Sequence, residues 1–135
     1  MLKIKSLFIL VLSLFTLTVF AGETPQISSQ DLLAALNKGT DNVVLLDVRS
    51  AGEYQHSHIA GAINISHDQI EKNLKQLAQY QASTVVVYCR SGRRAGIAEQ
   101  ILSSNGFSDV RHLTGDMNGW LEEKLPVTNS EHTHE

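Results

Sequence analysis

Two uninterrupted apolar segments constrain the fold of this chain more than any other feature. Residues 43–46 are all valine or leucine, and residues 84–88 are Thr-Val-Val-Val-Tyr. An alternating pattern would leave one face of a strand in water, whereas a continuous apolar run indicates a strand covered on both faces. The β-branched residues of the second segment also favour a strand over a buried helix. Both segments therefore predict buried strands of a parallel sheet.

Segments with apolar residues at helical spacing lie between and around these strands. Ser28 or Ser29 can cap a first helix, which runs to Asn37. The same spacing predicts amphipathic helices over residues 68–80 and 94–104. The side chains expected to face inward from the last helix are Ile97, Ala98, Ile101 and Leu102.

Shorter strands are predicted over residues 62–65 and 110–113. Strands that alternate with helices across short loops predict an α/β domain, in which helices cover both faces of a parallel sheet. The 135-residue chain suits one such domain. We place it at residues 28–127, after a linker at 22–27 and before a polar tail at 128–135.

The N-terminus has the pattern of an export signal over residues 1–21. Two lysines precede an apolar run from Leu7 to Phe20, and the small residue Ala21 stands at the expected cleavage point. A membrane-spanning helix needs roughly 20 apolar residues, so this run is short for an anchor. We therefore expect a periplasmic protein that begins at Gly22 and has no stable membrane anchor.

Charge and residue type exclude several kinds of partner. Without its two signal-peptide lysines the chain would carry 9 Lys and Arg against 14 Asp and Glu, a net charge near −5. This balance disfavours binding to nucleic acid or to anionic lipid. His132 and His134 lie in the polar tail without further ligands at fixed spacing, so they predict no metal site. No cofactor is expected.

Cys89 is the only cysteine in the chain. Because exported cysteines usually pair in disulfides, a lone one is either a buried small hydrophobe or a working nucleophile. Cys89 comes directly after the most apolar predicted strand, where ligands bind in parallel sheets. This position favours an accessible, reactive thiolate.

The segment that follows Cys89 has the composition of an anion-binding loop. A short turn before a helix points its backbone N–H groups inward, and Gly92 permits the positive φ that such a turn needs. Arginines add planar donors for an oxyanion and favour a thiolate, although cations at a helix N-terminus oppose the helix dipole. The loop residues predicted to bind substrate are Arg90, Ser91, Gly92, Arg93 and Arg94.

Three segments, in this order, resemble the signatures of the rhodanese family. They are Leu46-Asp47-Val48-Arg49 with Glu53-Tyr54 and His58-Ile59-Ala60-Gly61-Ala62-Ile63-Asn64-Ile65, then Val86 to Ala95 around Cys89, then Val110 to Trp120. The resemblance covers nearly all of the expected mature chain. It is closest to small exported members of the phage-shock protein E kind, and it departs at Asp116, where a glycine is common.

The resemblance implies a five-stranded parallel α/β fold and sulfurtransferase activity. In this family the catalytic cysteine takes a sulfur from thiosulfate, becomes a persulfide and passes the outer sulfur to a thiophilic acceptor such as cyanide or a thiol. Cys89 would be that nucleophile, with the amides of residues 90–94 around the persulfide. The implied partners are a small-molecule donor and acceptor, and an acceptor protein is not identified.

Four polar residues are predicted to support the site structurally. Asp47 and Arg49 are expected to form an ion pair, Glu53 to anchor the adjoining turn, and His58 to be a hydrogen-bonded structural histidine. Trp120 is expected to pack in the core or at the rim of the site.

Two alternative functions would also use a reactive cysteine. Cysteine-dependent phosphatases and arsenate reductases place five residues between cysteine and arginine, whereas Arg94 comes one residue too early for that spacing. A persulfide carrier or binding module would use the same loop as a sulfurtransferase, and turnover with thiosulfate would separate the two.

Overall fold

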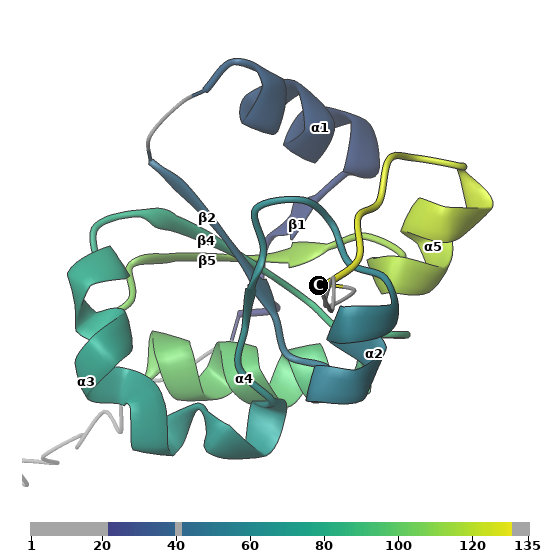
Figure 1. The fold of residues 1–135 in the computed structure, drawn as a ribbon. Coiled ribbons are helices and arrows are strands. Elements are labelled where there is room, and N and C mark those ends of the chain that lie inside the picture. The colour runs from purple at the N-terminus through teal and green to yellow at the C-terminus, as the bar shows by residue number, and fades with distance from the viewer. Residues whose placement is uncertain (1–21, 40–41, 131–135) are drawn as a thin grey trace, which may run out of the picture.

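The computed structural model describes residues 22–39 and 42–130 (Figure 1). The predicted signal peptide and both tail histidines lie outside the described residues. A five-stranded parallel sheet forms the centre, in the order β1-β5-β4-β2-β3. The strands are β1 (Gln26–Ile27), β2 (Val43–Asp47), β3 (Ile63–Asn64), β4 (Thr84–Tyr88) and β5 (Asp109–Leu113). The predicted α/β class and the parallel sheet are confirmed.

Helices cover both faces of this sheet (Figure 1). They are α1 (Ser29–Asn37), α2 (Ala51–His56), α3 (Leu74–Leu77), α4 (Arg93–Ser103) and α5 (Asp116–Glu122). Ser28 caps α1 by accepting the Asp31 amide, as its sequence indicated. Because β4 lies in the middle of the sheet, both of its faces are buried, which explains its uninterrupted apolar sequence.

Two apolar cores hold the layers together, one on each face of the sheet. The core under α3 and α4 contains Val85 and Val87 of β4, whereas the core under α1 and α5 contains Val86 and Tyr88. Alternate residues of one strand therefore stabilise opposite faces. Trp120 of α5 lies in the second core at 1 % exposure, and its ring nitrogen donates to the Pro126 carbonyl.

The segment predicted as one helix over 68–80 is broken into short pieces. Three-residue 3₁₀ turns at 67–69, 71–73 and 78–80 flank α3. The side chain of Asn73 donates to the Gln69 carbonyl, which an α-helix would use for the Asn73 amide. That amide bonds to the Ile70 carbonyl instead, so the turn tightens. The prediction of a continuous helix is wrong for this reason.

Further boundaries also differ from those predicted. The last two residues of the predicted linker form the edge strand β1, which pairs with β5. Thr128, in the predicted tail, exchanges backbone hydrogen bonds with His58. The expectation that Ile97 of α4 faces inward is wrong, because its side chain is 39 % exposed. Glu99 on the same helix is buried instead. Helices α2 and α5 were not predicted at all.

Within the described residues, no helix has the length and apolar content to cross a membrane.

Candidate active site around Cys89

Cys89 lies directly after β4, at the carboxyl edge of the sheet, and its loop leads into α4. Gly92 caps α4 with a φ of +118°, the backbone conformation that its sequence position indicated. Its amide donates to Cys89 Sγ at 3.0 Å. The sulfur therefore lies at the N-terminus of a helix and accepts a backbone hydrogen bond, an arrangement that stabilises a thiolate.

Cys89 is more buried than its sequence suggested. The residue is 1 % exposed and packs in the core beneath α4, so the expectation of an openly accessible thiol is wrong. A persulfide would place its outer sulfur about 2 Å beyond Sγ. This burial favours small reagents over another protein's thiol as the species that reaches Sγ.

The side chain of Arg94 is bound to Glu53 of α2 rather than directed to open solvent. Its two terminal nitrogens lie 2.7 and 3.0 Å from the two carboxylate oxygens of Glu53. The hydrogen bond from Arg94 lowers the pKa of Glu53 to about 2. Glu53 also forms a capping box with Ser50 at the start of α2. Arg94, predicted as a substrate ligand, therefore joins the Cys89 loop to α2.

This ion pair has a defined pH dependence. Because the pKa of Glu53 is lower in the folded protein, its contribution to stability is present above its ordinary pKa of 4.5 and is lost as the pH falls through about 2. The link between the loop and α2 is thus intact at neutral pH.

The other loop cations remain exposed. Arg90 and Arg93 are both exposed, as is Ser91 between them. Among the described residues, neither arginine forms an ion pair with an acidic side chain. Their guanidinium groups therefore keep their donors available beside the loop that holds Cys89.

The predicted ion pair between Asp47 and Arg49 is present and buried. The Nη2 atom of Arg49 lies 2.6 Å from Asp47 Oδ2 and 2.7 Å from the carbonyl of Ser57. The guanidinium also lies over the ring of Tyr88, 5.6 Å from its centroid. Through its contact with Tyr88, Arg49 links the end of β2 to the end of β4, and the ion pair that we predicted is present.

His58 has the structural environment predicted for it. Its Nδ1 lies 2.7 Å from the carbonyl of Tyr54, and the two rings stack with centroids 3.6 Å apart. Its backbone pairs with Thr128. His58 thus connects α2 to the C-terminal segment.

Three polar residues beside the Cys89 loop were not predicted as site residues: Glu99, His112 and Asp116. Asp116 Oδ1 accepts the Cys89 amide at 2.9 Å, and Asp116 Oδ2 lies 2.9 Å from His112 Nε2. Nδ1 of His112 is hydrogen-bonded to Glu99. The one sequence feature that indicated an unusual residue beside the site was Asp116, which stands where the family commonly has a glycine. We name these residues the Glu99–His112–Asp116 triad.

Gly92→Ala is expected to lower the free energy of unfolding by about 1–3 kcal/mol, because a side chain at positive φ is strained. The added Cβ would also lie 3.2 Å from Asp116 Oδ2. Gly96→Ala is the matched control, since nothing lies within 4 Å of its Cβ position inside α4. That control should gain roughly 0.5–1 kcal/mol. Urea unfolding measures the stability of both variants. Equal unfolding midpoints for Gly92→Ala and Gly96→Ala would contradict the strain expected at Gly92.

Comparison with known proteins agrees with this geometry. A sequence profile described as Rhodanese-like domain matches residues 28–123. The chain belongs to the rhodanese-like family. A rhodanese-related protein of Thermoplasma volcanium has a similar structure, with a TM-score of 0.68 and 28% identity over 79% of this chain and 99% of that one.

Several relatives of this chain have names that refer to sulfur transfer or sulfur carriage. It is 34% identical to the thiosulfate:glutathione sulfurtransferase of Saccharomyces cerevisiae, over 70% of this chain and 76% of that one. It is 37% identical to the thiosulfate sulfurtransferase PspE of Escherichia coli, over 52% and 67% respectively. A candidate sulfur carrier of Bacillus subtilis, YrkF, is 28% identical, and the match spans 52% of its length.

Proposed function

We propose that this protein is a thiosulfate sulfurtransferase that carries sulfane sulfur as a persulfide on Cys89. The observation that carries the proposal is the hydrogen bond from the Gly92 amide to Cys89 Sγ, in a loop at the N-terminus of α4. Such a loop stabilises negative charge on sulfur both before and after the transfer. The named sulfurtransferase relatives support the same reaction class.

The proposed reaction has two displacement steps. The Cys89 thiolate attacks the outer sulfur of thiosulfate, so an S–S bond to Cys89 forms while the original S–S bond breaks. Sulfite leaves with the electron pair. An acceptor nucleophile, cyanide or a thiolate, then attacks the outer sulfur of the persulfide. Thiocyanate or a new persulfide leaves, and the Cys89 thiolate is restored.

The exposed arginines are the proposed binding groups for the sulfonate end of thiosulfate. The protein is net acidic, so capture of a dianion requires local positive charge. Arg90 and Arg93 supply it beside the loop, whereas Arg94 is bound to Glu53. The role of Arg94 in this proposal is therefore to hold the loop rather than to bind the anion.

Arg93→Ala is expected to raise the thiosulfate KM about tenfold and to leave kcat within about twofold, since a charge-assisted contact to bound substrate is lost. The measurement is steady-state thiocyanate formation at two ionic strengths, because salt screens an exposed charge. Arg111→Ala is the control: Arg111 pairs with Asp109 at the opposite, amino end of the sheet. Equal KM values for the two variants would contradict the binding role.

A persulfide carrier is the second candidate, favoured by the likeness to YrkF. A carrier would gain one sulfur from a donor but would not release it repeatedly to cyanide. Multiple turnovers per chain with thiosulfate and cyanide would support the enzyme. One addition without turnover would support the carrier.

We also propose that the protein is exported to the periplasm, on the basis of the N-terminal apolar run and the two lysines before it. N-terminal sequencing of protein from the periplasmic fraction is expected to begin at Gly22. Membrane-bound material that retains Met1 would contradict this processing.

A further inference from the structure

The start of α5 is joined to the Cys89 loop by three hydrogen bonds. Besides the bond from the Cys89 amide to the Asp116 carboxylate, the Met117 amide donates to the Cys89 carbonyl at 2.9 Å. The Asn118 amide donates to the Arg90 carbonyl at 3.1 Å. Asp116 is 3 % exposed and has a φ of +54°, an unfavourable conformation for a residue with a side chain. The tertiary contacts of its carboxylate offset that strain.

The carboxylate of Asp116 is one end of the buried Glu99–His112–Asp116 triad. Each ring nitrogen of His112 lies at hydrogen-bonding distance from a carboxylate, Nε2 from Asp116 and Nδ1 from Glu99. An ionised carboxylate can only accept, so both bonds form when the ring carries both protons. With both carboxylates ionised, this geometry places a positively charged His112 between them.

These two hydrogen bonds change the titration of His112. The bond to Asp116, followed by that to Glu99, raises the pKa of His112 to about 10. Its contribution to stability is therefore fully present below its ordinary pKa of 6.5 and is lost as the pH rises through about 10. His112 keeps its charge throughout the neutral range.

We propose that Asp116 is a positioning residue for the Cys89 loop, that His112 is its counterion, and that Glu99 keeps His112 charged. The role in substrate binding rests on the proposed sulfurtransferase function, whereas the positioning itself does not. An ionised Asp116 without a counterion would place a negative charge beneath a loop that must admit a dianion. The charge of His112 offsets it while the carboxylate continues to hold the Cys89 amide.

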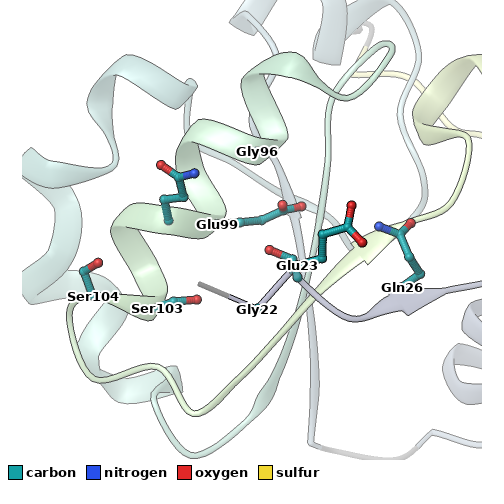
Figure 2. Close-up of a pocket in the computed structure, with 9 residues that line it drawn as sticks. Gly22, Glu23, Gln26, Gly96, Glu99, Ser103 and Ser104 are labelled. Carbon is teal, nitrogen blue, oxygen red and sulfur yellow. The ribbon is translucent and has the colours of Figure 1, made fainter. Parts of the chain in front are cut away.

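The groups around the His112 ring come from three parts of the described chain. Glu99 approaches from α4, Asp116 from α5, and the Cys89 loop approaches through Gly92, whose Cβ position is 3.7 Å from the His112 ring. Figure 2 shows Glu99 extending from α4 toward the segment that carries Glu23 and Gln26. Glu23 and Glu99 line one polar surface pocket. The two carboxylates that contact the ring, Asp116 and Glu99, both favour the charged form of His112.

The direct test is NMR of the ring nitrogens of His112 in the full chain, from about pH 6 to about pH 10.5. We expect His112 to remain doubly protonated to at least about pH 9 in the parent. Glu99→Gln should lower its titration midpoint by at least about one pH unit, because one carboxylate is removed. Glu71→Gln, the same change at an exposed position, should leave the midpoint unchanged.

The second measurement follows the Cys89 amide signal in the same samples. If Asp116 transmits the protonation state of His112 to the loop, the chemical shift of this amide should stay constant up to about pH 9 in the parent. In Glu99→Gln the chemical shift of the Cys89 amide should change at the pH of the lowered His112 titration midpoint. A residue that only filled space would not produce a pH-dependent change that moves with the midpoint of His112.

The third measurement is thiosulfate kinetics across the same pH range. In Glu99→Gln the KM should rise at least about threefold as the pH passes the lowered midpoint, with kcat within about twofold. Glu71→Gln should follow the parent.

The three measurements separate the possible failures. A parent His112 that titrates near 6.5, or a Cys89 amide that stays flat through the midpoint in Glu99→Gln, overturns the positioning proposal. A KM that does not respond overturns the counterion role in binding. A parent protein with no thiosulfate turnover contradicts the proposed function. The two NMR measurements do not depend on turnover, so they still test whether Asp116 positions the Cys89 loop.

Discussion

Cys89→Ser is expected to abolish both sulfur uptake and sulfur transfer. The parent, after treatment with thiosulfate, should gain about 32 Da, one sulfur, through attack of the thiolate. A serine hydroxyl is not ionised at neutral pH and cannot form a persulfide. Loss of a nucleophile should lower thiocyanate formation by at least about a thousandfold. Intact mass spectrometry and a cyanide assay measure the two effects.

The chain offers an internal control for this experiment. Cys89 is its only cysteine, so the added sulfur has no alternative thiol to occupy. The two residues are similar in size, and Cys89→Ser should remain folded, which near-ultraviolet circular dichroism can verify. Sulfur addition or turnover that persists in folded Cys89→Ser would refute the persulfide mechanism.

Asp47→Ala is expected to cause the largest loss of stability. It would leave Arg49 charged and without its carboxylate partner, in a pair whose side chains are 6 % and 0 % exposed. Breaking a buried pair by removing one member costs about 3–5 kcal/mol. For a domain of this size we expect the midpoint of thermal unfolding to fall by at least about 12 °C. Differential scanning calorimetry measures the change.

Asp109→Ala is the matched control for that variant. Asp109 also pairs with an arginine two residues along the chain, but both side chains are more than one-third exposed. An exposed pair contributes at most about 1 kcal/mol, so the midpoint should change by a few degrees at most. Similar changes in the two variants would show that the burial of the Asp47–Arg49 pair does not determine its contribution.

Local sequence alone determined the two buried central strands and the placement of Cys89 directly after one of them. The strands around residues 43–47 and 84–88 were predicted because a continuous apolar run is favourable only where both faces of a strand are buried. A cap at Ser28 or Ser29, which the structure places at Ser28, and the positive φ at Gly92 were predicted because each depends on one side chain and its own backbone. These preferences act over a few residues, so they can be predicted from the sequence.

The helix over 68–80 shows where local spacing is insufficient. Its apolar residues do face the core, with Ile70 and Leu77 buried. The hydrogen bond from the Asn73 side chain nevertheless replaces a helical one. Periodicity indicates which face is apolar, but it does not report competition for a single carbonyl.

The partners of the charged residues were decided by tertiary structure. Arg94 lies in the predicted anion-binding loop, yet Glu53, 41 residues away, binds its side chain. The Glu99–His112–Asp116 triad brings together α4, β5 and α5 beneath the Cys89 loop. A charged side chain can pair with any opposite charge that the fold brings within reach, and removal from water makes such pairing obligatory. Sequence therefore predicts where charges stand along the chain, whereas the packing of strands and helices decides which of them are bound.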